Sequence, residues 1–569
     1  MIFGVWNGDA MMLVNSFDRN RTGIAYFSME IALDSDIPTY AGGLGVLAGD
    51  TVRSAADLKV PLVAVSLVSR KGYFTQKLSA KGEQTELPSD WDPSKRAEEL
   101  PVRATVKIED RDVQVRAFHY QVSSPKGGNV PVLLLDTDLV ENQPGDREIT
   151  HYLYGGDLEY RLKQEVVLGI GGVRILNALG FRIRRYHMNE GHSALLSLEL
   201  LRENQLDAKR VKSMCIFTTH TPVEAAFDKF EYPMIDRVLG DLVPKDVIRQ
   251  YGGGERLNMT LLALNLSDYV NGVSRRYGEY STSLFPGYKV HAITNGVHSF
   301  TWTCAHFKRL YDRYLPGWAD EPSFLTRVGT IPDKEILEAH REAKEDLLTC
   351  VRTMTGIEMD PRVLTIGFAR RATGYKRPNL IFSDVDRLRK IARRWGLQII
   401  FAGKSHPKDE TGKLMIKQIF RYMEELKDDI KMVYLENYDL ALSKLMVSGV
   451  DVWLNTPQPP MEASGTSGMK AAHNGVLNFS VLDGWWVEGW IENVTGWAIG
   501  PHPHENVTPE ERKQQEKEDL YNKLNYIICP AYYDRVDDWA DMMQNSIGIL
   551  ASYFNSHRMM RRYVTDAYL

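Results

Sequence analysis

A run of small residues that ends in a lysine carries the clearest chemical pattern in this chain. It reads EASGTSGMKAAHNG over residues 462–475. Small residues let backbone N–H groups turn toward an anion, and a helix beginning near Met469 would add the positive end of its dipole. A lysine in a partly desolvated pocket, here Lys470, loses its proton easily, and its free amine can condense with an aldehyde. The pairing of a phosphate cradle with a lysine indicates bound pyridoxal phosphate; a flexible loop before a surface helix is the alternative on composition alone.

A second group of residues suited to phosphate is basic. Arg370 and Arg371 follow an apolar segment that ends at Phe368, and Lys376 comes shortly afterwards. A doubly charged phosphate needs several donors that stay protonated; arginine offers a fixed fork and lysine a point charge. The position directly after a predicted buried strand favours a phosphate site over a solvated basic turn.

These residues need a scaffold, and short apolar runs alternating with longer amphipathic stretches predict parallel sheets flanked by helices. In the second half the apolar runs recur at roughly 30-residue spacing, as in a Rossmann-type fold. The predicted strands are 60–65, 132–135, 214–217, 363–368, 397–401, 431–434 and 452–454. A long charged helix is predicted over residues 333–355.

The fold class that follows is α/β, with two Rossmann-like doubly wound domains facing a central cleft. A chain of 569 residues is too long for one core. We expect a first domain over residues 1–300, a second over residues 301–536 and a helical tail over residues 537–569. In such an arrangement the loops that follow the strands of both sheets line one cleft.

Composition excludes several classes of protein. Hydrophobic residues make up 43% and charged residues 25%, which is typical of a globular protein. A net charge of −5 offers no field for nucleic acid or an anionic membrane, so neither is expected as a partner. The four cysteines show no CxxC spacing, which argues against a disulfide framework or a zinc site and favours a reducing compartment.

The N-terminus lacks the pattern of a signal peptide, and no stretch approaches the ~18 apolar residues of a membrane span. We therefore expect a cytoplasmic location.

Several further motifs, in the same order along the chain, resemble those of the α-glucan phosphorylases, which act on glycogen, starch or maltodextrin. They are Tyr40-Ala41-Gly42-Gly43-Leu44-Gly45, Asn189-Glu190-Gly191-His192, Thr219-His220-Thr221, Thr294-Asn295-Gly296, the segment from Arg370 to Arg377, and Glu436-Asn437-Tyr438. The GGLG segment alone is not decisive, because starch and glycogen synthases also carry it and it lacks the spacing of a dinucleotide fingerprint. The set as a whole is similar to the short form of the phosphorylase family.

The resemblance implies a GT-B type glycosyltransferase fold with a C-terminal tail that crosses back to the first domain. It also implies pyridoxal 5′-phosphate as cofactor, held by Lys470 through a Schiff base. The implied reaction is reversible phosphorolysis: orthophosphate releases the terminal α-1,4-linked glucose of a glucan or maltodextrin as α-D-glucose 1-phosphate, with retention. The cofactor's phosphate would act as acid and base, so no pair of catalytic carboxylates is needed.

The resemblance also assigns roles to individual residues. Catalytic roles are implied for Lys470, Arg371, Lys376 and His220. Cofactor contacts are implied for Lys470, Thr466, Ser467, Arg370, Tyr438, Trp302 and Gly43. Contacts with substrate are implied for Gly42, Gly43, Leu44, His192, His220, Asn295, Glu462, Ser464 and Gly465. No metal site is expected, because the histidines show no zinc-like spacing.

Among these, the family residues matching Arg371 and Lys376 hold the reacting phosphate, and the one matching His220 contacts the glucose 6-hydroxyl. A second interpretation of Glu462 is a carboxylate that caps the helix after it. For Trp485 and Trp486, a place in the core is favoured over stacking on sugar.

The chain departs from the family pattern at three positions. Arg370 replaces a lysine, Asp439 replaces an arginine, and His473 replaces a larger apolar residue. The first keeps the charge but changes its geometry, and the third is expected to be a packing variant.

Two other functions stay open: a nucleotide-sugar-dependent glucosyltransferase on the same fold, and a glucan-binding regulatory protein derived from the enzyme. The full lysine motif disfavours the first and the retained site residues disfavour the second. A homo-oligomer is expected from the resemblance. Control by phosphorylation of a long N-terminal region, as in animal relatives, is not expected, because the chain starts a few dozen residues before GGLG.

Overall fold

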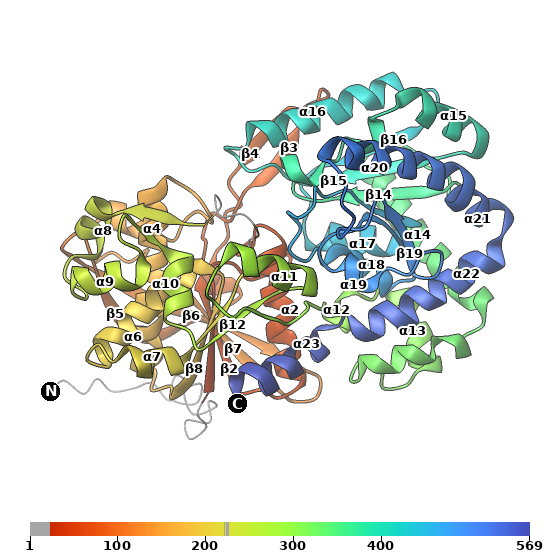
Figure 1. Cartoon of the computed structure of the whole chain (residues 1–569). Coiled ribbons are helices and arrows are strands. Elements are labelled where there is room, and N and C mark those ends of the chain that lie inside the picture. The colour runs from red at the N-terminus through yellow and green to blue at the C-terminus, as the bar shows by residue number, and fades with distance from the viewer. Residues whose placement is uncertain (1–22, 221, 223–226) are drawn as a thin grey trace.

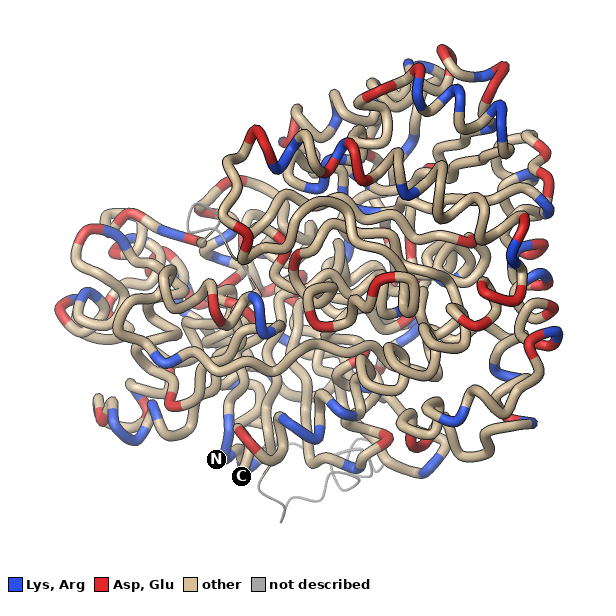
Figure 2. The backbone as a smooth tube through the Cα atoms, turned by 45° about the vertical axis from the view of Figure 1, so that its right-hand side comes forward, with Lys and Arg blue, Asp and Glu red and all other residues tan. Residues whose placement is uncertain are grey.

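Two mainly parallel β-sheets, one in each half of the chain, organise the molecule (Figure 1). The computed structural model describes residues 23–220, 222 and 227–569. The N-terminal residues 1–22, on which the expectation about a signal peptide depends, and Thr221 of the Thr-His-Thr motif lie outside the described residues. Within the described part, no helix is long and apolar enough to cross a membrane. Figure 2 shows basic and acidic residues interspersed over both halves of the molecule.

The first sheet has nine strands in the order β13-β12-β9-β8-β1-β2-β7-β6-β5. The strands from β13 to β7 are parallel, and β6 and β5 add an antiparallel edge. Their bounds are β1 (Gly23–Ser28), β2 (Leu62–Leu67), β5 (Glu98–Ile108), β6 (Arg111–Ser123), β7 (Asn129–Asp136), β8 (Ile183–Asn189), β9 (Cys215–Thr218), β12 (Tyr269–Gly272) and β13 (His291–Ala292). The chain order reverses between β1 and β8, which makes this pair the topological switch point.

The second sheet has six parallel strands in the order β16-β15-β14-β17-β18-β19. They are β14 (Thr365–Ala369), β15 (Gln398–Ala402), β16 (Lys431–Leu435), β17 (Val452–Asn455), β18 (Leu477–Val481) and β19 (Gly496–Ile499). Numbered along the chain this is the order 3-2-1-4-5-6 of dinucleotide-binding folds, with its switch point between β14 and β17.

Helices cover both faces of each sheet, which is why most strands are buried along their whole length and are almost continuously apolar (Figure 1). Those of the first half are α2 (Gly43–Asp57), α3 (Pro144–Arg147), α4 (Leu158–Val166), α5 (Gly172–Ala178), α6 (Leu195–Glu203), α7 (Ala208–Met214), α8 (Tyr232–Leu239), α9 (Lys245–Gly252), α10 (Met259–Asn265) and α11 (Arg275–Leu284). Those of the second half are α12 (Ser299–Trp302), α13 (Ala305–Tyr314), α14 (Asp333–Thr355), α15 (Val385–Trp395), α16 (Glu410–Glu425), α17 (Leu440–Gly449), α18 (Ser467–Ala472), α19 (Trp486–Gly489), α20 (Pro509–Lys523), α21 (Cys529–Asp534), α22 (Val536–Asn545) and α23 (Ser556–Tyr563).

The predicted α/β class with parallel sheets is confirmed. Each predicted strand overlaps an observed one, with ends that differ by at most three residues, and the helix predicted over residues 333–355 coincides with α14.

A small hairpin of the first half reaches across to the second sheet (Figure 1). It consists of the antiparallel strands β3 (Thr75–Leu78) and β4 (Gln84–Leu87). Gln76 donates to the carbonyl of Gly403 at 3.0 Å and accepts from the backbone N–H of Asn437 at 3.0 Å. The side-chain oxygen of Gln84 accepts from the backbone of Ser405 at 3.0 Å. We call this element the bridging hairpin.

The C-terminal tail ends against the first sheet. Helix α23 packs on α2. Tyr568 hydrogen-bonds His187 of β8 at 2.7 Å, and the other ring nitrogen of His187 bonds Thr218 at 2.8 Å. His187 is thus a buried histidine with both ring nitrogens bonded.

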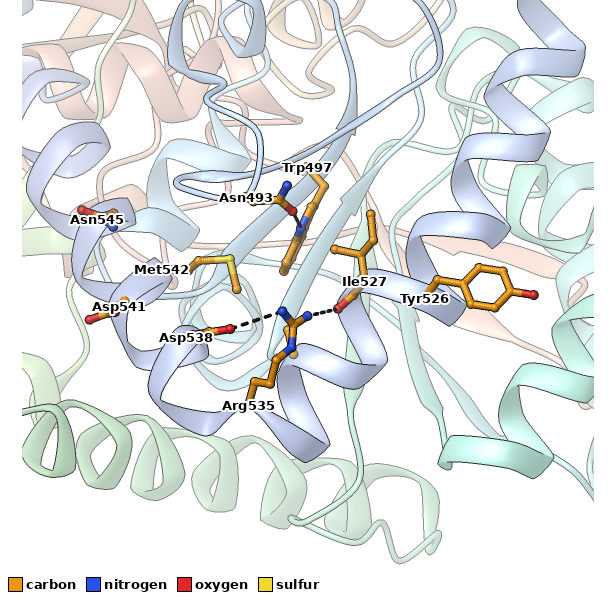
Figure 3. Close-up of a pocket in the computed structure, with 10 residues that line it drawn as sticks. Asn493, Trp497, Tyr526, Ile527, Arg535, Asp538, Asp541, Met542 and Asn545 are labelled. Carbon is orange, nitrogen blue, oxygen red and sulfur yellow. Dashed lines mark hydrogen bonds and ion pairs between the residues drawn. The ribbon is translucent and has the colours of Figure 1, made fainter.

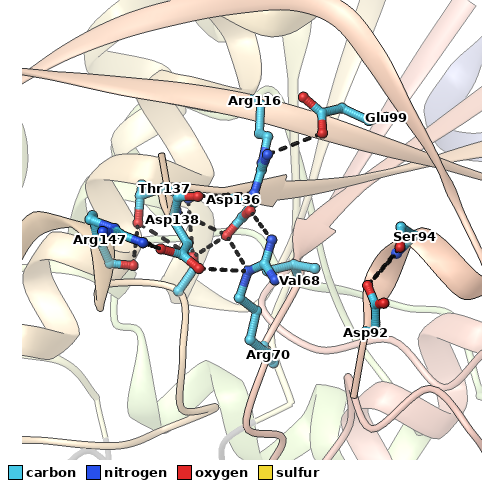
Figure 4. A network of polar contacts seen from close by, with 12 residues as sticks. Val68, Arg70, Asp92, Ser94, Glu99, Arg116, Asp136, Thr137, Asp138 and Arg147 are labelled. Carbon is cyan, nitrogen blue, oxygen red and sulfur yellow. Dashed lines mark hydrogen bonds and ion pairs between the residues drawn. The ribbon is translucent and has the colours of Figure 1, made fainter. Parts of the chain in front are cut away.

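A polar network at the end of β7 fixes two loops that lead to the cleft (Figure 4). Asp136, which is fully buried, accepts from Arg70 at 2.7 Å, Arg116 at 2.8 Å and Thr150 at 3.0 Å. Because Arg70 follows β2 and Thr150 lies in the loop after α3, one carboxylate joins both segments to the sheet.

Candidate active site

The site residues predicted from the motifs follow the strands at the two switch points. Gly42 and Gly43 come after β1, and His192 comes after β8. Arg370 and Arg371 follow β14, and Glu462 lies in the loop after β17. Ligands of open α/β sheets bind outside the carboxyl ends of the strands at such points. Contacts join the two sets of loops: the Tyr40 hydroxyl accepts from the backbone of Leu440 at 3.0 Å, and the Ser274 hydroxyl donates to the carbonyl of Ala463 at 2.6 Å.

Lys470 lies on α18 and is only 6% exposed. Its Nζ is 4.1 Å from the centre of the Trp302 ring, a cation–π distance. No hydrogen bond or ion pair ends on this nitrogen among the residues that the structure describes. Burial lowers the pKa of Lys470 to about 8, and the charge of Arg370 adds to the effect while Asp50 opposes it. The side chain is therefore an unpaired buried amine that is partly deprotonated near neutral pH.

Asp50 orients the ring beneath this lysine. The carboxylate is 1% exposed and accepts from Trp302 Nε1 at 2.8 and 3.1 Å. Sequence reasoning missed Asp50, because its partner is 252 residues away and no motif marks it. The only signal was a carboxylate that follows a run of small and apolar residues, 42–49.

The basic cluster surrounds one carboxylate. Arg370 NH1 lies 2.8 Å from Glu462 Oε2 and also donates to Asn455, and Lys376 pairs with the same Glu462 oxygen. Burial acts to raise the pKa of Glu462, but Arg370 and Lys376 outweigh it and hold it at about 2. Glu462 is thus held by cations and does not cap α18, whose N-cap is Thr466 without a side-chain cap bond. The second interpretation of Glu462 was wrong, because two positive side chains compete successfully for the carboxylate.

Arg371 differs from its neighbours. Its side chain is exposed, and within the described ranges no hydrogen bond or ion pair involves its guanidinium. Three cations and one carboxylate (Arg370, Arg371, Lys376 and Glu462) leave this group with a net positive charge of two, so a doubly charged anion would neutralise it.

Polar atoms without partners mark the side of the site assigned to sugar. Ser464 Oγ, Asn295 Oδ1 and His192 Nδ1 are buried and unbonded. An unsatisfied buried polar group costs ~1–3 kcal/mol, so ligand hydroxyls that complete these bonds would be bound favourably. His220 Nε2 donates to Asn189 Oδ1 at 2.7 Å, and its backbone N–H donates to Glu190 at 2.8 Å.

Both histidines of this region stay neutral. Burial lowers the pKa of His220 to about 3, and burial together with the charge of Arg161 lowers that of His192 to about 3. They can therefore exchange hydrogen bonds with hydroxyl groups but carry no charge at neutral pH.

The glycines of the GGLG segment fall into two kinds. A Cβ on Gly45 would lie 2.7 Å from Glu30 and from Tyr40, so this glycine is required by packing. A Cβ on Gly42 or Gly43 would meet no protein atom within 4 Å. These two positions open onto free space at the N-terminus of α2, where backbone N–H groups favour an anion. Leu44 follows within the first turn of that helix.

The helix that carries Lys470 begins two residues earlier than predicted. Helix α18 begins at Ser467 rather than near Met469 and has only six residues. Gly465 adopts a φ of +83°, which a side chain would strain, and Ser467 Oγ accepts from Trp453 at 3.1 Å. The chain turns here because Gly465 permits a left-handed conformation.

The three departures from the family pattern have local explanations. Asp439 caps α17 by accepting from the backbone of Leu442 at 2.8 Å. His473 bonds Ser299 at 2.9 Å and the carbonyl of Met469 at 2.7 Å, so it is a hydrogen-bonded packing residue. The fork of Arg370 reaches both Asn455 and Glu462, which a single lysine nitrogen would do less readily.

Tyr438 and the two tryptophans complete the surroundings. Burial raises the pKa of Tyr438 to about 12, and its hydroxyl donates to Ser443 at 2.9 Å. Trp485 and Trp486 are 2% and 0% exposed, so they belong to the core as expected.

An aromatic pocket adjoins Arg371. It holds about 290 Å³ and is lined by Tyr73, Phe74, Tyr152, Tyr154, His406 and neighbouring residues. The charge of Arg371 acts on the pKa of Tyr73, Tyr154 and His406, which places the guanidinium beside them. Sequence reasoning assigned none of these residues, although two tyrosines at positions 152 and 154 were a visible signal.

A larger cavity of about 570 Å³ lies away from these loops, between α21, α22 and the start of β19 (Figure 3). Its Arg535 is paired with Asp538 at 3.3 Å, and Trp497 donates to Asn493 at 3.0 Å. Because these polar groups are already partnered, the cavity offers no comparable chemistry.

The model of the family described as carbohydrate phosphorylase matches residues 243–523. The maltodextrin phosphorylase of Thermococcus litoralis is 38% identical over 99% of this chain and 72% of its own length. The chain belongs to the carbohydrate phosphorylase family. The glycogen phosphorylase of Aquifex aeolicus is 36% identical over 97% of this chain and 87% of its own length. The glycogen phosphorylase of Mycobacterium tuberculosis is 36% identical over 96% of this chain and 71% of its own length. The family depends on pyridoxal phosphate.

Proposed function

We propose that this member of the family catalyses reversible phosphorolysis of the terminal α-1,4-linked glucose of a glucan or maltodextrin, giving α-D-glucose 1-phosphate with retention. One observation carries the proposal. Unpartnered buried groups, the Lys470 amine, Ser464 hydroxyl and Asn295 oxygen, gather at the switch points of a GT-B type pair of sheets beside a cluster with net positive charge. Such a site suits a neutral sugar together with phosphate.

The residues present fit pyridoxal phosphate. Lys470 offers an unpaired amine whose pKa is lowered by burial, and the indole of Trp302 supplies an aromatic wall beside it. Thr466, Ser467, Tyr438, Arg370 and Gly43 are the proposed neighbours of the cofactor. When bound, the group supplies a phosphate whose second pKa near ~6 allows proton exchange at neutral pH.

The chain's own residues would position the reactants. Arg371, which has no hydrogen-bond or ion-pair partner among the described residues, and Lys376 would hold orthophosphate, and the backbone at Gly42 and Gly43 would approach it closely. Lys376 shares Glu462 with Arg370, so an incoming phosphate would compete for these cations and free the Glu462 carboxylate to accept from a sugar hydroxyl.

The remaining polar groups would bind the sugar. Ser464, Asn295 and His192 have unfilled hydrogen-bonding capacity, and His220 is held neutral by burial. Such fixed dipoles stabilise developing charge without reorganising. Glu462 with a pKa of about 2 is a poor general acid, which agrees with a reaction that does not use a carboxylate pair.

The proposed division of the chain follows the sheets. The last strand of the first sheet ends at Ala292 and the first strand of the second begins at Thr365, so a boundary near residue 300 separates them. The tail after residue 537 would then fasten the second domain to the first.

The test is release of glucose 1-phosphate from maltodextrin by protein supplied with pyridoxal phosphate, with and without orthophosphate. We expect release only with orthophosphate and none from Lys470→Ala. Glucosyl transfer that requires a nucleotide sugar instead would replace the proposal with the alternative transferase, and cofactor and glucan binding without turnover would indicate a regulatory descendant.

A further inference from the structure

Three residues far apart in the sequence meet behind the site. Asp57 ends α2, His298 directly precedes α12 and His557 lies on α23. Nε2 of His298 and of His557 lie 2.8 and 2.9 Å from the same oxygen of Asp57. All three possible ligand atoms lie within 4.8 Å of one another. The histidines are 6% and 2% exposed.

The two rings differ in how they are held on the side away from Asp57. His298 Nδ1 is bonded to Thr301 Oγ1 at 2.6 Å, which fixes the ring and leaves Nε2 toward Asp57. Metal-binding histidines are usually held in this way by an outer partner. His557 Nδ1 is buried without a partner, so its ring is bonded only through the nitrogen that faces the cluster.

We propose that Asp57, His298 and His557 bind one divalent transition-metal cation, for which zinc is the best match. Two imidazoles and a carboxylate are ligands that zinc accepts, with water as a fourth. In the metal-free state each imidazole donates its Nε2–H to Asp57. The cation would take the place of both Nε2 protons, which move through solvent to Nδ1 of the same rings, so that each histidine stays a neutral ligand.

The geometry requires only a small adjustment. Tetrahedral zinc at ~2.0–2.1 Å from each ligand separates neighbouring ligand atoms by about 3.3 Å. The two pairs seen here are shorter than that by about half an ångström. Because the three ligands come from separate elements, slight shifts of α23 and of the start of α12 away from Asp57 would accommodate the ion.

The ion would act as a structural clamp on the sugar site. The backbone of Ser556 donates to the carbonyl of Val297 at 2.8 Å, and Arg558 donates to the carbonyl of Asn295 at 2.9 Å. His557 lies between these two contacts. A cation that ties His557 to α2 and to the start of α12 would therefore hold the backbone that presents Asn295. The clamp concerns this chain's stability and does not depend on the proposed reaction.

The experiment uses the full chain with its cofactor in a phosphate-free buffer. Metal content is measured by plasma mass spectrometry, and the thermal midpoint is followed during titration with zinc chloride. We expect one zinc per chain and a midpoint that rises with the logarithm of free zinc, because the ion binds the folded state. Cobalt in place of zinc should give the visible bands of a four-coordinate ion.

His557→Gln separates the metal from the hydrogen bond, because the amide can still donate to Asp57 but is a poor ligand. We expect its zinc affinity to fall by at least ~100-fold, beyond the 10–100-fold typical of losing an outer partner. His291→Gln, which alters a histidine stacked on Tyr269 away from the cluster, should bind zinc like the wild type. Asp57→Asn is the second variant if the first does not fold.

A wild-type chain that takes up no cation at saturating zinc, or a His557→Gln variant that binds zinc as tightly as the wild type, would overturn the proposal and leave a hydrogen-bonded cluster. Loss of phosphorolysis alone would not, because metal content and thermal midpoint are measured without substrate.

Discussion

The amine of Lys470 should titrate near pH 8 in the cofactor-free protein. Burial is the main reason, since it disfavours the charged form. At pH 7 a lysine of pKa 8 is ~10% free amine, whereas one at 10.5 is only ~0.03%, a difference of about 300-fold. Protonation below pH 8 should therefore slow attachment of the cofactor in proportion to the remaining amine.

Asp50→Asn tests the electrostatic part of this reasoning. Asp50 raises the pKa of Lys470, so removing its charge should lower that pKa further and raise the amine fraction at pH 7 above the ~10% of the wild type. The asparagine oxygen can still accept from Trp302 Nε1, so the ring keeps its orientation.

The assay is competitive labelling of lysines with trace acetic anhydride between pH 6 and pH 11, read by peptide mass spectrometry. Lys427 serves as the internal reference, because its side chain is exposed and its pKa is raised by Glu424. Lys470 should reach half-maximal labelling well below Lys427. The reasoning fails if both lysines titrate together, or if Asp50→Asn raises the midpoint of Lys470.

Three further outcomes are expected. Lys470→Ala should lose bound cofactor, seen as loss of its absorbance, while its circular dichroism stays that of the wild type; activity near the wild-type level would refute the anchor. Arg371→Ala should raise the KM for orthophosphate at least ~10-fold and that for maltodextrin much less, because among the described residues this guanidinium has no partner and is free to bind phosphate. The matched control is Arg362→Ala, which removes an arginine side chain that is 88% exposed. Equal effects on the KM for both substrates would make Arg371 structural. Glu462→Gln should lower the free energy of unfolding by ~3–5 kcal/mol in denaturant titrations, because it leaves Arg370 and Lys376 buried without their counterion. An unchanged midpoint of denaturant unfolding would contradict this pairing.

The strands that the sequence predicted are apolar because helices cover them on both faces, but β1, β8 and β18, which are also mostly buried, were not predicted. Residues 397–401, for example, are an apolar run that overlaps β15, all of which is buried. The edge strands β5 and β6 were not predicted. They largely alternate buried and exposed side chains, a weaker signal than a continuous apolar run, and the pairing shifts register within β5, between Glu99 and Arg103.

The candidate site could be predicted where residues act within short motifs. Lys470, Arg371 and Gly42 are recognisable from their neighbours in sequence. Asp50 and the clamp of Asp57 and His557 depend on contacts across 252 and 500 residues, which no local pattern encodes. The pairing of Glu462 with two cations likewise emerges only once β14 and β17 lie side by side.

The bridging hairpin belongs covalently to one half of the molecule and by hydrogen bonding to the other. If the two halves rotate relative to each other, the hairpin stays with the second sheet, and the segments on either side of it must bend. Those segments contain Tyr73, Phe74 and Pro88, which line the aromatic pocket beside Arg371. Filling that pocket with a ligand and rotating the two halves therefore act on the same few backbone torsions. Ligand binding in the pocket and the angle between the halves are thus thermodynamically linked, and the ligand favours the angle at which it binds more tightly.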